Sequence, residues 1–530
     1  MLLHLLLLLL WCVLGLSLRL VDLASQPPWT DECATLVFSL GNSFRTVPLD
    51  RLIGIDTLLH PLQPRPEAGV TDVFEHLMGE STHPPLYFIL AHGWMNAWMK
   101  LFSPELSSNS TPENGLVSLW AARSLPALLG TASIPAIFGC CYLTTRDRPI
   151  AHLAAALAAV SPFAVYLARE ARHYTLVLLL IIASFCCLVE AARRIRDGKS
   201  FPLWLSLAWI ATNTLGIAVH YFFALTLCSE LLVLVGFSIL RWRSGFPHQP
   251  AWKNIGLAVL GTSVGSLVWF PIWQDIRQSN LTGWVYDGSP GIIEPIGRSI
   301  AWLSSTLILL PSDTFVLPLA IVVISGLAAI GFLIWFIRQF DRELKIQTRE
   351  PNTRFAILAF GGIVAASLFL MLGFTYGLGS DLTLAPRFSF IYFPAWIILV
   401  ATCLGAWLRK GSAPIDLLKQ NVPVAIVGLA GILGSLTVIS NLGYLQNHRS
   451  DLMADLISRT SQAPVLIATT HKHHGDTGRM MGLAWEFHHH PKLAWTQPPQ
   501  FLLAHKTEDS PDGTPAAISL QQAVAELPRP

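Results

Sequence analysis

Two adjacent carboxylates, Asp31 and Glu32, follow the first apolar run of the chain, in the sequence Trp29-Thr30-Asp31-Glu32. The run before them, residues 2–18, is almost wholly apolar, as a membrane-spanning helix must be. Charge is costly beside a bilayer, so a carboxylate pair in this place indicates a functional site. A carboxylate can act as a general base on a hydroxyl or an amine, or can help to hold a divalent cation. The alternative for Asp31 is that it only caps a helix over 32–40.

The composition is that of a membrane protein. Hydrophobic residues make up 52% of the 530 residues and charged residues 13%, and the mean hydropathy is +0.51. A soluble domain carries about 25% charged residues, so most of this chain is expected to lie in lipid. The formal net charge of +2 and the lack of a basic arm give no indication of a nucleic-acid partner. Only Cys33 of the eight cysteines lies outside an apolar run, so we expect no disulfide framework.

Apolar runs that are long enough to cross a bilayer predict eleven spans. They lie near 1–20, 116–143, 150–168, 174–192, 202–219, 221–240, 252–272, 314–338, 355–378, 388–408 and 422–440. With a cytoplasmic N-terminus, the inner loops hold 17 Lys and Arg residues, whereas the outer loop 21–115 holds four. Cytoplasmic loops are normally the basic ones, so the shorter run 84–101 is predicted to stay on the outer face as an interfacial helix.

The predicted fold is a mainly α, polytopic membrane protein of about 11 transmembrane helices with outer-face interfacial helices and a small C-terminal α/β domain. Residues 1–440 form the membrane module. Residues 441–530 form the second domain, because they are polar, contain one strand-like run at 463–470, and fray after about Thr507. Six of the 17 histidines lie in two clusters there. Such clusters can bind zinc or copper, but no cysteine or spaced carboxylate completes a set.

The polar residues near the spans gather at their outer ends, whereas the inner loops offer only cations and turn residues. The outer set comprises Asp31, Glu32, His83, Arg123, Arg169, Glu170, Arg172, His173, Tyr174, His220, Tyr221, Trp273, Asp275, Arg277, Asp381 and Arg387. Arginine binds phosphate through paired hydrogen bonds and keeps its charge when it is partly dehydrated. Carboxylates and arginines at a membrane surface therefore suit a lipid substrate that bears a phosphate.

Several of these residues also have a purely structural interpretation. Glu170 could form an intramembrane ion pair with Arg169 or Arg172. His83 and His220 could be interfacial side chains, and Arg123 could extend toward the lipid headgroups.

Four segments stand in a specific order and spacing between residues 15 and 280. They are WTDE (29–32), HPPLYFIL (83–90), ARSLPALLGTASIP (122–135) and AAALAAVSPFAVYLAREARHYTLVLLL (154–180). Together they resemble the membrane module of the GT-C glycosyltransferases, nearest to the group of protein O-mannosyltransferases and lipid A aminoarabinose transferases.

This resemblance implies an inverting glycosyltransferase that moves a hexose or pentose from a polyprenyl-phosphate donor to a protein, lipid or glycan acceptor. Asp31 would be the catalytic base or would orient the acceptor, with Glu32 as its support and Glu170 facing it across the cavity. The donor phosphate would be bound by Arg19, Arg123, Arg172 and Arg387. The substrate cavity would be lined by His83, Tyr174, His220 and Tyr221.

No cofactor is certain from the sequence. Asp31 and Glu170 would share a divalent metal ion if one is used, but Glu170 replaces the Asp of the O-mannosyltransferases, which leaves metal use open. The expected partners are a polyprenyl-phosphate-linked sugar donor, an acceptor of unknown class and the lipid bilayer. The expected location is the inner (cytoplasmic) membrane, with the active site and the C-terminus on the extracytoplasmic side.

Two other functions compete with this one. In a lipid-linked sugar transporter or flippase, the same residues would bind the substrate without reacting. Many transporters carry an inverted repeat, and we find none in this sequence. The other alternative is an inactive GT-C scaffold that serves as a partner subunit, and the intact Asp31, Glu170 and arginines argue against it.

Overall fold

The structure is a computed structural model of the chain. It describes residues 2–102, 115–247, 249–275, 279–286, 291–405, 414–446, 449–461, 464–489, 498–506 and 514–527.

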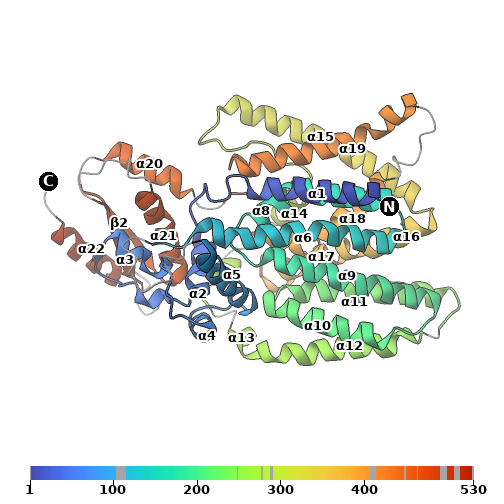
Figure 1. The fold of residues 1–530 in the computed structure, drawn as a ribbon, viewed down its shortest axis with the longest axis horizontal. Helices are drawn as coiled ribbons and strands as arrows, with labels where there is room; N and C mark the ends of the chain where they lie inside the picture. Colours follow the sequence, from blue (N-terminus) through green and yellow to red (C-terminus); the bar gives the residue numbers. More distant parts are fainter. Residues whose placement is uncertain are drawn as a thin grey trace.

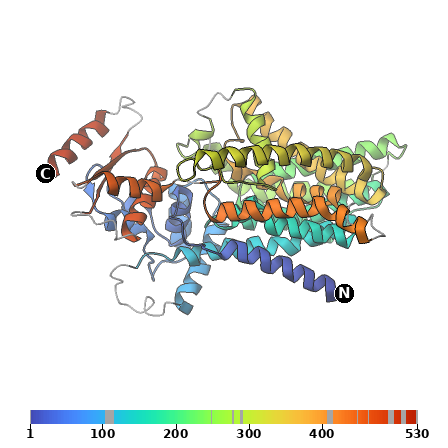
Figure 2. The same cartoon turned by 90° about the horizontal axis from the view of Figure 1, so that it is seen from above.

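A bundle of long apolar helices forms most of the molecule, and a smaller α/β unit lies at one end of it (Figures 1 and 2). Among the described residues, eight helical segments are long and apolar enough to cross a membrane. They are Leu2–Leu20 (α1), Leu119–Thr145 (α6), Tyr174–Asp197 (α9), Phe223–Arg243 (α11), Ala251–Gln274 (from α12, Ala251–Ser266, into α13, Phe270–Asp275), Leu319–Gln347 (α15), Pro351–Leu378 (from α16, Pro351–Ala356, into α17, Gly362–Leu378) and Val422–Ile439 (in α19, Pro414–Ile439). The chain is therefore a multi-pass membrane protein.

A ninth span is possible where two helices form one bent pair. α7 (Arg148–Val160) and α8 (Pro162–Ala168) meet at an angle of 56°. Proline at the start of α8 has no N–H to continue the first helix, and the hydroxyl of Ser161 accepts a hydrogen bond from Ala164 N. This sequence therefore ends one helix and begins the next in a new direction.

The predicted count of eleven spans is not confirmed. Two of the predicted spans correspond to shorter apolar helices, α10 (Leu203–Val219) and α18 (Phe393–Leu404). The run 84–101 forms α5 (Leu86–Phe102), which is not among the span candidates. α5 lies beside α2 (Thr30–Ser39) and α4 (Val70–Glu80) at the end of the bundle that faces the α/β unit (Figure 1).

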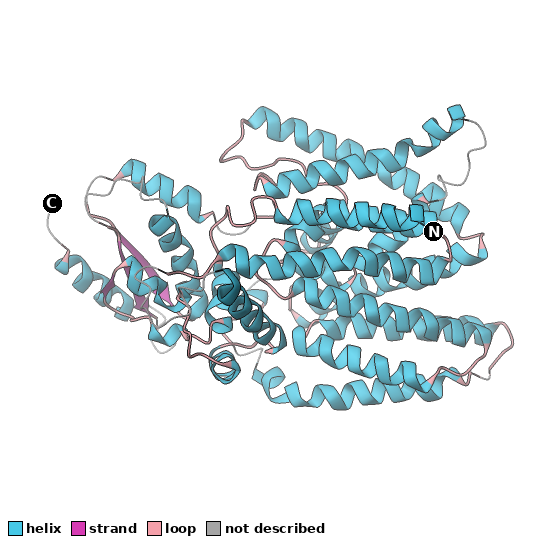
Figure 3. Cartoon of the chain, in the orientation of Figure 1, coloured by secondary structure: helices cyan, strands magenta, loops and turns pink. Residues whose placement is uncertain are grey.

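The α/β unit contains a small sheet, the only strands in the described residues (Figure 3). Its strand order is β1-β3-β2, formed by Leu52–Ile53, Gln500–His505 and Leu466–His471. β2 and β3 are parallel, with Leu466 opposite Gln500, whereas β1 pairs antiparallel with β3, with Leu52 opposite Leu502. The predicted strand at 463–470 is thus present in β2.

The sheet joins two distant parts of the chain, because β1 belongs to the outer loop 21–115 and β2 and β3 belong to the C-terminal tail. The other helices of this unit are α3 (Ile55–Leu59), α20 (Ser450–Thr460), α21 (His474–His489) and α22 (Thr514–Glu526). One buried cluster contains side chains from both parts, including Phe38, Leu77, Met481 and Phe501. The division of the chain at 440/441 stays a prediction.

Residues 514–526 form a helix where the sequence predicts a frayed end. Ala516 and Ala523 of α22 pack against Leu502 and Ala504 of β3. Burial of this short apolar stripe orders a segment whose neighbours in sequence are polar and rich in turn residues. Thr507 lies outside the described residues.

α21 approaches the helix of the carboxylate pair very closely, and glycine allows this approach. A Cβ atom at Gly478 would lie 3.1 Å from the carbonyl oxygen of Thr30, and one at Gly482 would lie 2.7 Å from that of Pro28. The C-terminal unit therefore packs directly on the segment that carries Asp31.

Candidate active site

α2 carries both carboxylates in its first turn, but their environments differ. Trp29, not Asp31, is the N-cap residue of this helix, so the structural interpretation of Asp31 as a cap does not hold. The Glu32 side chain is 1% exposed, whereas that of Asp31 is 27% exposed. Asp31 is therefore the carboxylate that a substrate can reach.

Two arginines from distant parts of the chain flank the carboxylate of Asp31. Its Oδ2 lies 3.3 Å from Nη2 of Arg387 and 3.7 Å from Nη2 of Arg172. Arg172 also donates from Nη1 to the backbone carbonyl of Asp31 and to Oγ1 of Thr35, both at 2.9 Å. The structure thus brings together three of the predicted site residues, with two positive charges around one negative charge.

Arg387 lies in the short helical segment Pro386–Ile391 and is surrounded by aromatic rings. Its guanidinium carbon lies 5.1 Å from the ring centroid of Trp29 and 5.7 Å from that of Trp284. Burial alone would favour the neutral guanidine, but Asp31 and the other groups nearby, Tyr174, Tyr166 and Glu170, raise the pKa of Arg387 above its ordinary value. The side chain is therefore a fixed cation at the centre of the site.

His83 holds Arg172 from the other side. Its Nε2 lies 3.1 Å from Nη2 of Arg172, and its Nδ1 lies 3.1 Å from Oγ of Ser81. Since a guanidinium can only donate, Nε2 must be the acceptor and the ring must be neutral. Burial and the charge of Arg172 lower the pKa of His83 to about 3, which agrees with this tautomer. His83 is thus a positioning residue for Arg172.

Four histidines near this site are held neutral in the folded protein, so acid should destabilise it. Burial lowers the pKa of His474 to about 4 and, with nearby cations, shifts the pKa values of His173 and His220 well below the ordinary range. An unfolded histidine has a pKa of about 6.5. Stability is therefore fully present above about pH 6.5 and falls as the pH drops toward 4, because only the unfolded chain takes up these protons.

We expect the double variant H83Q/H474Q to flatten this acid dependence. Each histidine contributes a slope of at most about 1.4 kcal/mol per pH unit, and glutamine has no proton to gain in this range. Unfolding of the protein in detergent, followed between about pH 4 and 7.5, measures the slope. If the free energy of unfolding of the variant falls with pH as steeply as that of the wild type, His83 and His474 are not held neutral in the folded protein.

Glu32 and Arg123 form a buried pair. Arg123 donates from Nε to Oε1 of Glu32 at 2.8 Å and from Nη2 to Oε2 at 2.7 Å. Its remaining N–H groups bind the backbone carbonyls of Leu23, Gln26 and Pro27, at 2.9–3.2 Å. Glu32 also accepts a hydrogen bond from the backbone N–H of Ala171, at 2.7 Å.

All five donors of Arg123 are therefore used inside the protein. The sequence predicts Arg123 as a phosphate ligand, but this geometry leaves it no N–H for a phosphate. The pair instead ties the loop before α2 to the loop 169–173, and so holds Asp31 and Arg172 in their positions. The sequence also predicts support by Glu32, and this contact is consistent with it.

We expect R123Q to lower the free energy of unfolding by about 3–5 kcal/mol, because it leaves the Glu32 carboxylate buried without its cation. The double variant E32M/R123M should recover part of this loss, since it removes both charges. Denaturant titration in mixed micelles measures both effects. Unchanged stability of R123Q together with a raised KM for the lipid donor would contradict the structural role.

Arg19 binds backbone carbonyls of α1 and α7. It is fully buried near the end of α1, where it donates from Nη1 to the carbonyls of Gly15 (2.8 Å) and Ala159 (3.1 Å) and from Nη2 to that of Ala158 (3.1 Å). The last carbonyls of a helix have no partner within that helix. Arg19 thus caps the C-terminal end of α7 at its junction with α8, a position that sequence spacing alone does not distinguish from phosphate binding.

Glu170 is a buried residue near Glu32 and Arg123. It is 5% exposed and, with Glu32 and Arg123, lines a cavity of about 80 Å³. The hydroxyl of Tyr166 hydrogen-bonds its carboxylate. The charges of Asp31 and Glu170 both raise the pKa of Arg387, so Arg387 lies near both predicted acidic residues. The contacts of the two arginines do not favour the alternative, in which one of them forms an intramembrane ion pair with Glu170. Arg169 donates to backbone carbonyls of residues 19, 21 and 22, and the guanidinium of Arg172 lies beside the carboxylate of Asp31.

Buried rings form a cluster behind Arg172. The ring of His173 lies 4.7 Å from that of Tyr174, 4.7 Å from that of His220 and 5.7 Å from that of His83. Three of the predicted cavity residues are thus together. Tyr221 is apart from them, because its ring packs near Trp269 and Trp273.

The residues at Asp31 fit a metal ion poorly. A divalent cation bound there would lie beside two guanidinium groups that are 3.3 and 3.7 Å from Oδ2, and like charges repel. In the described part of the chain, no group of three or more His, Cys, Asp and Glu side chains is arranged to hold a metal ion. This covers the described histidines of the two C-terminal clusters, whereas His490 lies outside the described residues.

No protein-family model and no curated protein matches the chain. Its structure, however, resembles that of ArnT from Cupriavidus metallidurans bound to undecaprenyl phosphate. The alignment covers 97% of this chain and 88% of ArnT, with 14% identity and a TM-score of 0.50. The chain has the GT-C fold. The prediction of the fold from the sequence is thereby confirmed.

Other solved structures of this GT-C group align less closely. ArnT in the apo state matches over 93% of this chain and 89% of its own, with 13% identity and a TM-score of 0.45. The apo oligosaccharyltransferase of Archaeoglobus fulgidus matches over 91% of this chain and 64% of its own, with 12% identity and a TM-score of 0.44.

Three contributors to the site were not predicted. Thr35 orients Arg172, and the Trp29 and Trp284 rings flank Arg387. Thr35 follows Asp31 by one helical turn, which is a usable signal once α2 is recognised. The tryptophans are indistinguishable in sequence from an aromatic belt at the membrane surface.

Proposed function

We propose that this protein is an inverting glycosyltransferase, which moves a sugar from a polyprenyl-phosphate donor to an acceptor at the extracytoplasmic surface of the inner membrane. The observation that carries the proposal is the carboxylate of Asp31 between Arg387 and Arg172, at one end of a bundle with the GT-C fold. ArnT, which has this fold, is seen with undecaprenyl phosphate.

In the proposed reaction, Asp31 takes the proton from the acceptor hydroxyl or amine. The acceptor atom forms a bond to the anomeric carbon of the sugar, and the bond from that carbon to the phosphate oxygen breaks. The electron pair of the broken bond remains on the phosphate, and polyprenyl phosphate leaves. A single displacement of this kind inverts the anomeric carbon.

Arg387 and Arg172 are the proposed ligands of the donor phosphate. The leaving phosphate gains negative charge as the bond breaks, so fixed cations stabilise the transition state more than the ground state. Two guanidinium groups flank the carboxylate of Asp31 here, and both can pair with an anionic lipid phosphate when it binds. When the phosphate takes the place of Asp31 in these ion pairs, Asp31 loses its counterions and becomes a stronger base.

The other predicted residues take supporting roles in this proposal. The pair of Glu32 and Arg123 holds together the loop before α2 and the loop 169–173, and His83 positions Arg172. Glu170 acts on the centre of the site by its charge, which raises the pKa of Arg387. We assign Arg19 to helix capping rather than to phosphate binding.

Chemical turnover separates this function from that of a flippase. We expect purified protein in nanodiscs to release one polyprenyl phosphate for each sugar that appears on an acceptor from an envelope extract. A flippase would move the intact donor across the membrane and release none. Transbilayer movement of unreacted donor without any free polyprenyl phosphate would overturn the assignment.

We expect transfer to continue unchanged when divalent cations are removed with EDTA. The physical reason is that Arg387 and Arg172 already supply the positive charge at Asp31. Activity is measured before and after exhaustive dialysis against the chelator. A loss that Mg²⁺, Mn²⁺ or Zn²⁺ restores would assign to Asp31 and Glu170 the shared metal ion that the sequence leaves open.

A further inference from the structure

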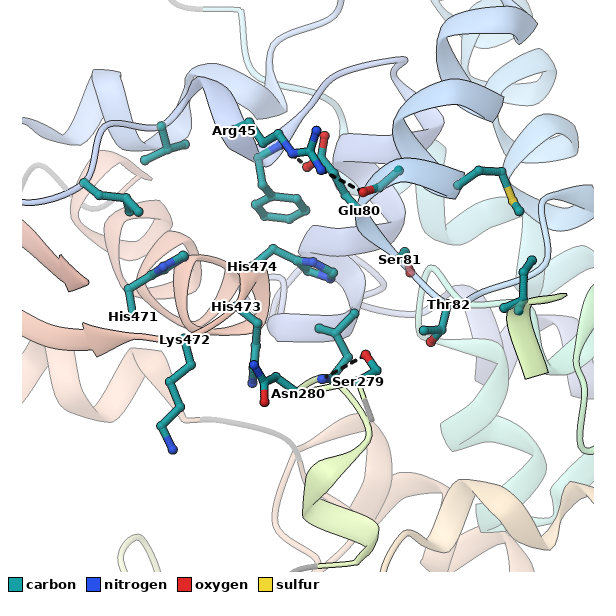
Figure 4. Close-up of a pocket in the computed structure, with 17 residues that line it drawn as sticks. Arg45, Glu80, Ser81, Thr82, Ser279, Asn280, His471, Lys472, His473 and His474 are labelled. Carbon is teal, nitrogen blue, oxygen red and sulfur yellow. Dashed lines mark hydrogen bonds between the residues drawn. The ribbon is translucent and has the colours of Figure 1, made fainter. Parts of the chain in front are cut away.

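A large cavity of about 790 Å³ lies between the α/β unit and the helices that follow α2 (Figure 4). In the view of Figure 4, His471, His473 and His474 lie on one side, Glu80, Ser81 and Thr82 lie on the other, and Ser279 and Asn280 lie below. Phe44 and Arg45, from the loop after α2, also line it, so the walls come from four separate segments of the chain.

The cavity carries an excess of positive charge. Arg45 and Lys472 line it, and Glu80 is the acidic residue of the lining. Both carboxylate oxygens of Glu80 already have partners, since Oε1 binds Oγ of Ser43 at 2.5 Å and Oε2 accepts from Phe44 N at 3.1 Å. Arg45 and Lys472 are both exposed, and no ion pair of either is present within the described residues. Their charges are therefore available to a ligand.

The remaining lining suits a carbohydrate. The hydroxyls of Ser81 and Thr82 and the amide of Asn280 can each donate and accept hydrogen bonds, as sugar hydroxyls require. The ring of His474 stacks on Phe44, with centroids 4.9 Å apart and planes 23° apart. Stacked rings at the wall add apolar surface beside the polar groups.

The cavity adjoins the catalytic centre. Ser81, on its wall, is hydrogen-bonded to His83, which in turn binds Arg172. The ring of His474 lies close enough to Asp31 for that charge to act on it. The cavity wall is therefore connected through Ser81 and His83 to an arginine that flanks Asp31.

We propose that this cavity is the acceptor site and that it selects an anionic glycan, one that carries a phosphate or carboxylate group. The proposal rests on the transferase function argued above. Arg45, from the loop after α2, and Lys472, from the turn between β2 and α21, recognise the negative charge. The C-terminal unit thereby determines which acceptor is used.

Binding without turnover tests this proposal independently of catalysis. The probe is a fluorescent tetrasaccharide with one phosphate monoester, compared with its dephosphorylated form, on full-length protein in nanodiscs. We expect wild type and D31N to bind the phosphorylated form about tenfold more tightly, the effect of one charge-assisted hydrogen bond in an open cavity. The variant R45Q/K472Q should lose this preference.

The matched control is R51Q/R459Q, which removes two exposed arginines of the same unit that do not line the cavity. It should keep the wild-type preference. Equal binding of both probe forms by the wild type, or a preference that survives in R45Q/K472Q, would overturn the proposal. Displacement of the probe by polyprenyl phosphate would also overturn it, since it would place the probe in the donor site.

A second arm identifies the source of the glycan. The same phosphorylated tetrasaccharide is presented free in solution or as the head group of a glycolipid in the nanodisc. Tenfold selectivity for the free form supports a soluble glycan, and selectivity for the lipid-linked form supports a glycolipid. If the wild-type protein binds the phosphorylated probe selectively but transfers no sugar, the transferase function is refuted and the charge-selective cavity is not.

Discussion

Sugar transfer should fall by about 10²- to 10⁴-fold in D31N, the largest loss that we expect from a single substitution near the site. Asparagine keeps the size of the side chain but cannot take a proton. The carboxylate of Asp31 is partly exposed, and the buried hydrogen bonds that join this turn to Arg123 and Ala171 are made by Glu32. Folding and donor binding should therefore be retained, so the loss appears in kcat. The rate of polyprenyl phosphate release in nanodiscs measures it.

E75Q is the control for this experiment. Glu75 is an exposed carboxylate on α4, in the same extramembrane segment, and its replacement should leave transfer unchanged. A D31N protein that is folded and still transfers sugar at a tenth of the wild-type rate or faster would contradict the role of Asp31 as the base.

The second large effect is expected at Arg387. R387Q should lower kcat/KM for the lipid donor by about 10²- to 10³-fold, because one fixed cation at the leaving phosphate is lost. R387K should recover only part of the activity, since an ammonium group cannot bind a phosphate through two parallel hydrogen bonds or stack on the Trp29 ring in the same way. Steady-state kinetics at varied donor concentration measures both variants.

R65Q is the matched control for Arg387. Arg65 is an exposed arginine of the outer loop that pairs with Glu67 on the surface, and its loss should not change donor kinetics. If R387Q raises the KM for the acceptor and leaves the KM for the donor unchanged, Arg387 binds the acceptor, and its assignment to the donor phosphate is wrong.

The membrane architecture could be predicted largely from hydropathy. Long apolar runs and the excess of Lys and Arg in alternate loops correctly indicated a polytopic bundle, and the run at 84–101 indeed forms a helix that is not a span candidate. The number of spans could not be predicted as well. Ser161-Pro162 breaks one run by 56° into two helices, and the short α10 and α18 are apolar without reaching full span length.

The grouping of polar residues around Asp31 could also be predicted from the sequence, but the contacts of Arg123 could not. Asp31, Arg172, Arg387 and His83 are polar residues at the outer ends of spans, and the structure places them together. Arg123 has the same signature in sequence. Its use is decided by the backbone carbonyls of Leu23, Gln26 and Pro27, and tertiary contacts of this kind leave no pattern in the chain.

The C-terminal unit was the least predictable part. β1 has only two residues, Leu52 and Ile53, and no alternation from which to recognise a strand. It pairs with a segment about 450 residues away. The contribution of residues 471–474 to a cavity beside Asp31 depends on this long-range pairing and on the glycines of α21, so the histidine cluster alone could not reveal it.

The most direct test of the central claim is an experimental structure of the protein in nanodiscs with a bound polyprenyl phosphate. We expect phosphate oxygens about 2.7–2.9 Å from the guanidinium nitrogens of Arg387 and Arg172. Asp31 should then be free of both arginines and open toward the cavity of His471–His474. If the phosphate lies instead at Arg19 or Arg123, with the ion pairs of Asp31 intact, Arg387 and Arg172 do not bind the donor phosphate.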